Sequence, residues 1–102
     1  MRELDATTFD AAIAAGPVVV DFWAPWCKPC RAIEPFLEAI EQDAEGRLAF
    51  AKLNIDEYPE IAARYEVLSI PTVTLFEAGE PRTVVVGARP RGHFERAFAD
   101  WI

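Results

Sequence analysis

The sequence predicts a single α/β domain over residues 1–102, with a central mixed β-sheet flanked by helices on both faces. Apolar runs typical of buried strands alternate with segments of helical spacing, and the last two runs are separated only by a turn. Strand–helix–strand units followed by a hairpin and a terminal helix give a sheet of mixed strand direction. At 102 residues and 52% hydrophobic, the chain can form one compact core.

The first predicted element is a short helix. Thr7 or Thr8 can cap a helix that runs through Ala15, and Gly16-Pro17 ends it. Residues 18–23 follow as an apolar run interrupted by one carboxylate, which is the pattern of a strand covered on both faces.

The middle of the chain predicts a helix, a strand and a second helix. The long helix opens at the cysteine pair and runs to about Ala44, before Gly46. Residues 48–54 alternate as a strand, and residues 58–65 form a short helix with proline in its first turn.

The last third of the chain predicts a hairpin and a closing helix. Residues 72–76 and 82–86 are rich in β-branched and apolar side chains, and the turn over 77–81 carries Gly79. Residues 90–101 have the spacing of an amphipathic helix.

Charge and composition exclude several classes of protein. A net charge of −7 leaves no basic stripe to neutralise phosphates, so nucleic acid is not expected as a partner. No run approaches the ~20 apolar residues that span a bilayer. The amino terminus lacks the pattern of a signal peptide, and two cysteines are too few for a secreted disulfide framework. We therefore expect a cytoplasmic protein.

The only two cysteines, Cys27 and Cys30, lie where the first long strand gives way to the long helix. A spacing of three on a helix brings the thiols within bonding reach. The start of a helix also offers free N–H groups and the positive end of the dipole, which favour the thiolate that attacks disulfides. We interpret the pair as a reactive dithiol. The alternatives are inert core cysteines or half of a zinc site, for which the only histidine, His93, is far along the chain.

Asp21 is unusual because it is a lone carboxylate in an apolar strand. Burying such a group is costly unless it is paired, neutral or functional. Desolvation should raise the pKa of Asp21 towards the range useful for proton transfer at neutral pH. The alternative is a structural carboxylate that caps a nearby backbone group.

Residues 20–31, VDFWAPWCKPCR, resemble the active-site segment of the thioredoxin family. Three further blocks follow in the family's order, so the resemblance covers essentially the whole chain. It implies the thioredoxin fold and reduction of protein disulfides through a reversible Cys27–Cys30 dithiol/disulfide. Two departures are Lys28, where the family usually carries glycine, and Ser69, where glycine is frequent. The further blocks are residues 52–56, 69–72 and 86–88.

The resemblance and the thiol chemistry together assign the expected catalytic roles. Cys27 is expected as the exposed nucleophile and Cys30 as the shielded resolving thiol. The resemblance implies that Asp21 is the acid beneath the cysteines that takes the proton of the resolving thiol, directly or through water. It also implies that Lys52 is the lysine close to that acid; the alternative is a solvated charge at a strand end.

The remaining expected site residues would form a groove for the substrate. The resemblance implies a cis Ile70–Pro71 bond that faces the cysteines and leaves the Ile70 backbone free to pair with an extended substrate. Without the family resemblance, the simpler interpretation of Pro71 is a trans proline that starts an edge strand. Position suggests that Trp26 is partly exposed and that Trp23 packs beside the disulfide. The expected substrate-binding residues are Trp26, Lys28, Pro29, Ile70, Pro71 and Gly87.

The expected partners are disulfide-containing target proteins and an NADPH-dependent thioredoxin reductase. No cofactor, metal or membrane is expected, and the protein is expected to be a monomer. Two other function classes remain open at this point. One is an oxidant or isomerase that makes or shuffles disulfides in an oxidising compartment, and the other is a binding module in which the thiols matter little.

Overall fold

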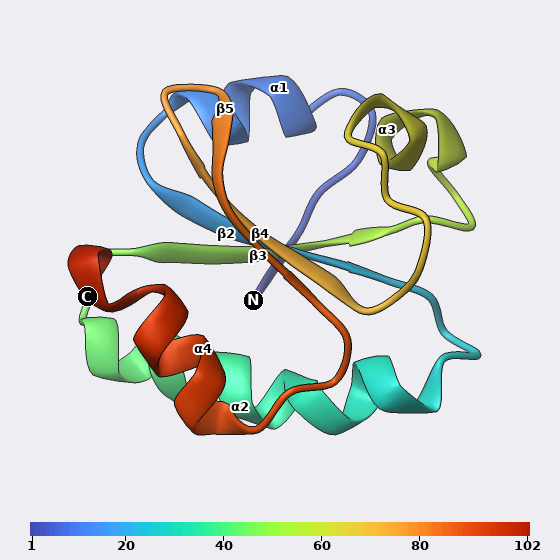
Figure 1. Cartoon of the computed structure of the whole chain (residues 1–102). Helices are drawn as coiled ribbons and strands as arrows, with labels where there is room; N and C mark the ends of the chain where they lie inside the picture. Colours follow the sequence, from blue (N-terminus) through green and yellow to red (C-terminus); the bar gives the residue numbers. More distant parts are fainter.

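The chain folds around a five-stranded mixed sheet with helices on both faces, as predicted (Figure 1). The computed structural model describes all residues from Met1 to Ile102. Helices α1 and α3 lie on one side of the sheet, and α2 and α4 lie on the other. The strands are β1 (Arg2–Glu3), β2 (Val18–Trp23), β3 (Ala49–Asn54), β4 (Thr72–Glu77) and β5 (Glu80–Val86). The helices are α1 (Phe9–Ala14), α2 (Lys28–Ala44), α3 (Pro59–Arg64), α4 (Arg91–Ala97) and the 3₁₀ turn η1 (Ala99–Trp101).

Strand β2 is at the centre of the sheet, whose order is β1-β3-β2-β4-β5. It pairs in parallel with β3 on one side and antiparallel with β4 on the other. Since both its edges and both its faces are covered, β2 is apolar along its length apart from Asp21. The outer strand β1 was not predicted, because two residues are too few to show a period.

The side chains of β2 divide between two apolar clusters, one on each face of the sheet. Val18, Val20 and Phe22 pack in the cluster that includes Phe9 and Ile61 of α1 and α3. Val19 packs on the other face, among residues of α2 and α4. Side chains alternate along a strand, so Asp21 lies on the same face as Val19. The sheet therefore holds this carboxylate on the side that α2 covers.

The predicted N-cap of α1, Thr7 or Thr8, is right in position but not in the expected side-chain hydrogen bond. Thr8 is the N-cap residue but its side chain makes no capping hydrogen bond. The Asp5 side chain instead closes the turn that leads into α1, because its Oδ1 accepts from the backbone N–H groups of Thr7 at 2.9 Å and of Thr8 at 3.0 Å. The Thr8 hydroxyl is turned back towards Asp5 and accepts from the Asp5 backbone N–H at 3.0 Å. The helix ends at Ala14, one residue earlier than predicted.

The predicted closing helix is too long. It ends at Ala97 and is followed by the 3₁₀ turn η1, which tightens the chain after the buried Phe98. This turn packs Trp101 against the core, where its Nε1 donates to Glu77 Oε2 of β4 at 3.2 Å. The other boundaries agree with the prediction to within a residue or two, and the hairpin turn is shorter than the predicted range 77–81.

Strands β4 and β5 are joined by a two-residue turn, Ala78-Gly79, in which both residues have positive φ, 54° and 81°. This conformation matches the type I′ turn, which favours Asn-Gly. The Gly79 N–H also donates to the carbonyl of Ile13 at 3.0 Å, which attaches the turn to α1. Ala78 is therefore the strained member of the turn, because alanine is disfavoured at positive φ.

We expect Ala78→Asn to raise the free energy of unfolding by about 0.5–1 kcal/mol, because asparagine tolerates the left-handed region better than alanine. Urea denaturation of the oxidised protein measures this change. As a control, Gly79→Ala should lower the free energy of unfolding by about 1 kcal/mol. Nothing lies within 4 Å of an added Cβ at Gly79, so this loss would come from the backbone alone. A destabilised Ala78→Asn variant would contradict the turn assignment.

Candidate active site

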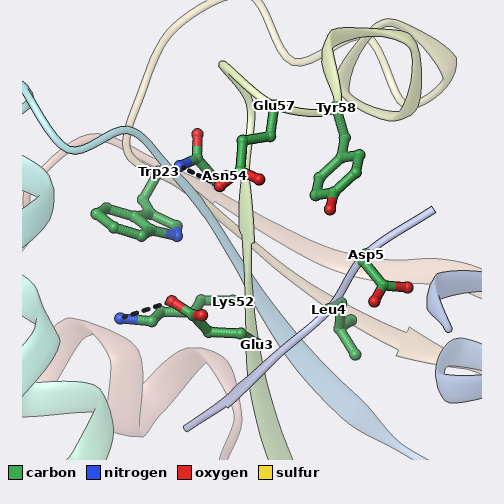
Figure 2. Close-up of a pocket in the computed structure, with 8 residues that line it drawn as sticks. All are labelled: Glu3, Leu4, Asp5, Trp23, Lys52, Asn54, Glu57 and Tyr58. Carbon is green, nitrogen blue, oxygen red and sulfur yellow. Dashed lines mark hydrogen bonds and ion pairs between the residues drawn. The ribbon is translucent and has the colours of Figure 1, made fainter. Parts of the chain in front are cut away.

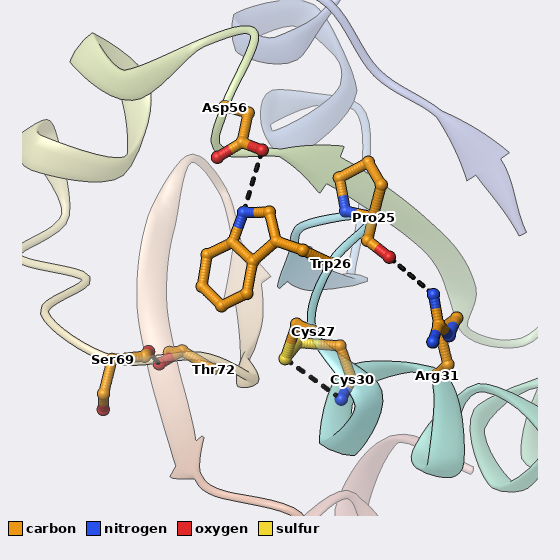
Figure 3. Close-up of a disulfide and its surroundings, with 8 residues drawn as sticks. All are labelled: Pro25, Trp26, Cys27, Cys30, Arg31, Asp56, Ser69 and Thr72. Atoms are coloured by element: carbon orange, nitrogen blue, oxygen red, sulfur yellow. Dashed lines mark hydrogen bonds between the residues drawn. A yellow bond between two sulfur atoms is a disulfide. The ribbon is translucent and has the colours of Figure 1, made fainter.

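The cysteine pair lies at the amino-terminal end of α2. Cys27 is the N-cap residue and has an extended backbone, whereas Cys30 lies in the first turn. The two are joined by a disulfide, and the Cys30 backbone N–H donates to Cys27 Sγ at 3.2 Å (Figure 3). Pro29 occupies the first turn, where its missing N–H costs no helical hydrogen bond. The sequence thus directs the Cys27 sulfur at the free amide groups of the helix.

Both cysteines are buried in the disulfide form. Cys27 is 4% exposed and Cys30 is 1% exposed. The prediction that Cys27 is exposed is therefore wrong for this state, although the order of exposure is as predicted. The reason is that Ala24 packs with the two cysteines, and Trp23 and Ile70 pack against them.

Trp26 and Trp23 differ in how far they are exposed beside this buried pair. Trp26 is 66% exposed, and its Nε1 donates to Asp56 Oδ2 at 3.0 Å (Figure 3). Trp23 packs against the cysteine cluster. Both placements were predicted, but Asp56 was missed. The sequence could have indicated that Asp56 lies near Trp26, because the two residues follow the carboxyl ends of β2 and β3, which are parallel neighbours in the sheet.

The segment before β4 packs beside the cysteine pair. The Ile70–Pro71 bond is cis, as the resemblance implied, and Ile70 packs against the cysteine cluster. Thr72 Oγ1 donates to the Ser69 carbonyl at 2.6 Å, which closes the loop (Figure 3). Gly87 has a φ of 98° and donates its N–H to the Pro71 carbonyl at 2.8 Å. The predicted groove residues Ile70, Pro71 and Gly87 are therefore brought together, and Lys28 and Pro29 are exposed at the start of α2.

Asp21 is 1% exposed, and neither of its carboxylate oxygens has a hydrogen-bond partner. The alternative of a backbone-capping carboxylate is therefore wrong. Burial, with a smaller contribution from the negative charge of Glu34, raises the pKa of Asp21 from 3.8 to about 7, against the opposing effect of Lys52. The carboxyl can thus gain or lose a proton near neutral pH.

Lys52 is the neighbour of Asp21 in the β2–β3 register. Its side chain is only 15% exposed, so it is not the solvated charge of the alternative interpretation. The ammonium pairs with Glu34 Oε1 at 3.2 Å and Glu3 Oε1 at 3.8 Å, and lies 4.5 Å from the centre of the Trp23 ring.

Glu34 was not predicted as a site residue from the sequence. It follows Cys30 by four residues, one turn along the same side of α2, and this spacing could have identified it.

A cavity of about 230 Å³ lies at the edge of the site, between β1 and the loop after β3 (Figure 2). It contains neither cysteine, so disulfide exchange does not take place there. The residues that line the cavity are Glu3, Leu4, Asp5, Trp23, Lys52, Asn54, Glu57 and Tyr58.

No group of three or more histidine, cysteine or acidic side chains is arranged to hold a metal ion. None of the helices has the length and apolar character of a bilayer-spanning segment.

The fold and the disulfide at the start of α2 define a thiol–disulfide oxidoreductase. Residues 1–100 match the Thioredoxin family model. The thioredoxins of Staphylococcus aureus strains Mu50, MW2 and N315 are each 48% identical to this chain over 83 residues, which cover 81% of this chain and 80% of theirs. The chain belongs to the thioredoxin family. It reduces protein disulfides through the reversible Cys27–Cys30 pair.

Asp21→Asn keeps the shape of the side chain and removes the ionisable group, so it measures the cost of the buried charge. The pKa of Asp21 is about 7 when folded and near 3.8 when unfolded. Above pH 7 the folded state therefore bears the full free-energy cost of burying the Asp21 charge. This cost decreases as the pH falls and is absent below about pH 4. We expect the variant to be more stable than wild type by about 2–4 kcal/mol at pH 8, with no advantage below pH 4.

Urea denaturation of the oxidised protein at a series of pH values measures this difference. Asp100→Asn is the matched control, because Asp100 is exposed and its replacement removes the same charge without relieving a buried carboxylate. An Asp21→Asn variant that is less stable at pH 8, or equally stabilised at every pH, would contradict this account of the buried charge.

Proposed function

We propose that Cys27 and Cys30 reduce target disulfides in the cytoplasm by two successive thiol–disulfide exchanges, with Asp21 accepting a proton in the second. The observation that carries this proposal is the Cys27–Cys30 pair at the start of α2, on the side of the sheet that holds the unpaired Asp21. In the first exchange, the Cys27 thiolate attacks one sulfur of the target disulfide and the other target sulfur leaves as a thiolate.

The position of Cys27 supports its role as the nucleophile. As the N-cap residue of a long helix, it faces free N–H groups and the positive end of the dipole. The Cys30 N–H already points at its sulfur in the disulfide form. In the reduced form the same donor would stabilise a Cys27 thiolate, which is the reactive species.

The second exchange releases the target. Cys30 loses its proton and attacks Cys27 Sγ, so that the Cys27–Cys30 disulfide forms and the second target sulfur leaves as a thiolate. An ordinary thiol has a pKa of ~8.5, so a nearby base helps this step at neutral pH. Asp21 is suited to the role because its pKa is about 7 and no hydrogen bond competes for the proton. Lys52 acts on Asp21 as a nearby positive charge.

The groove beside the cysteines is the proposed target-binding site. The N–H and C=O of Ile70 make no hydrogen bond within the chain, so they are available to an extended target segment. Trp26 offers an exposed aromatic surface next to Cys27. The other proposed contacts are Lys28, Pro29, Pro71 and Gly87.

Disulfide-containing proteins and a thioredoxin reductase are the general partners of this family. We further propose that this chain works as a monomer and that an NADPH-dependent thioredoxin reductase returns the Cys27–Cys30 disulfide to the dithiol. A compartment that keeps thiols reduced, such as the cytoplasm, fits a reductase. The test is catalytic turnover of insulin disulfides with NADPH and such a reductase. Failure to accelerate insulin reduction would overturn the proposal.

Replacing each cysteine by serine separates their roles. Cys30→Ser should accumulate stable mixed disulfides with targets, because the resolving thiol is absent, whereas Cys27→Ser should trap nothing. In the reduced wild type, iodoacetamide should modify Cys27 well before Cys30 at pH 7. Non-reducing electrophoresis and peptide mass spectrometry measure these outcomes. Trapping of targets by Cys27→Ser would contradict the assignment of Cys27 as the nucleophile. Equal alkylation rates would contradict the expected difference in reactivity between Cys27 and Cys30.

Lys28 departs from the glycine that is usual in the family, and its ammonium should stabilise the Cys27 thiolate. Since the thiolate exists only in the reduced form, Lys28→Gly should lower the reduction potential. An exposed charge interaction of about 0.2–1 kcal/mol corresponds to a shift of roughly 5–20 mV for this two-electron couple. Equilibration with a glutathione or dithiothreitol redox buffer measures it. The shift should shrink at high salt, because the charges are screened; a salt-independent shift would point to a different cause.

A further inference from the structure

The cation nearest to the buried Asp21 is held by other carboxylates. Lys52 is the residue beside Asp21 in the register of β2 and β3, and it is the positive charge that acts on the Asp21 carboxyl. Its ammonium nevertheless makes no ion pair with Asp21, whose two oxygens have no partner. The ammonium pairs with Glu34 at 3.2 Å and with Glu3 at 3.8 Å.

Glu34 is the stronger of these two partners. Its side chain is 27% exposed and its oxygen is the nearer one, whereas the Glu3 side chain is 70% exposed. Water and salt screen an exposed pair more than a shielded one. The lysine stem is further confined by the Trp23 ring, which lies 4.5 Å from the ammonium. The position of the Lys52 ammonium is thus set mainly by Glu34 and Trp23.

We propose that Glu34 is a positioning residue of the redox site, which holds the Lys52 ammonium in an ion pair away from Asp21 and so leaves the Asp21 carboxyl unpaired and available to exchange a proton. The relevance of this to catalysis rests on the proposed role of Asp21 in releasing the target. An ammonium paired directly with Asp21 would stabilise its carboxylate and make it a weaker base. Glu34 prevents that pairing and also repels the carboxylate directly, and both effects favour the protonated acid.

The groups that face Asp21 are few. From β3 there is Lys52, from α2 there are Glu34 and the cysteines at its start, and Glu3 of β1 acts through Lys52. Strand β4 places the apolar Val73 beside Asp21. Helix α4 adds no charge to the core on this face. Its core residues there are Phe94 and, at its C-cap, Phe98.

The direct test is a pH titration of the Asp21 carboxyl group in the oxidised protein. The ¹³C NMR chemical shift of its carboxyl carbon reports the protonation state. Glu34→Gln should lower the Asp21 midpoint by about half a pH unit or more, and Lys52→Met should raise it. Glu3→Gln is the matched control, because it removes the more exposed partner of the same ammonium and should shift the midpoint less. An unchanged or raised midpoint in Glu34→Gln would overturn the proposal.

The double variant Glu34→Gln, Lys52→Met separates positioning from direct repulsion. If Glu34 acts through Lys52, its effect on the Asp21 midpoint must be smaller when Lys52 is absent. An equally large effect with and without Lys52 would show repulsion alone and overturn the positioning role.

The rate of target release against pH connects the titration to catalysis. In Glu34→Gln the midpoint of this profile should move to lower pH together with the Asp21 titration. If Asp21→Asn releases targets at the wild-type rate at every pH, the proposed catalytic role of Asp21 fails. The NMR titration would still decide whether Glu34 controls Asp21, so the two failures can be distinguished.

Discussion

The burial of one unpaired carboxylate in the central strand is the constraint on which the site depends. Asp21 lies in β2, which is paired on both edges and covered on both faces, so water cannot solvate its charge. The surrounding apolar core that stabilises the fold is therefore also what raises the proton affinity of this group. The packing of α2 on the sheet therefore both stabilises the fold and raises the pKa of Asp21.

The same strand order assembles the rest of the site at one end of the sheet. The carboxyl end of β2 leads to Trp26 and the cysteines, and the carboxyl end of β3 leads to Asp56. Antiparallel β4 begins at the same end, directly after Pro71. Residues from three separate parts of the chain thus meet because of strand direction. None of these segments could form the site alone.

Local patterns made most of the fold predictable, and contacts between elements were the part that was missed. The period of the apolar residues located the long strands and α2, and a lone charge in an apolar run identified Asp21. The exposure of Cys27 was wrongly predicted because it depends on Trp23 and Ile70, which come from other segments. Glu34 was missed for the same reason, since its partner Lys52 is eighteen positions away. The cis Ile70–Pro71 bond followed only from the family resemblance.

The proposed target-binding site beside the cysteines offers mainly backbone groups. The free amide and carbonyl of Ile70 and the small Gly87, bonded to the Pro71 carbonyl, offer backbone groups rather than deep pockets for particular side chains. Every protein presents the same backbone groups wherever a segment is extended and accessible. Recognition of the proposed kind would select targets by local unfolding or flexibility around a disulfide rather than by sequence, so that one small protein could reduce many unrelated target proteins.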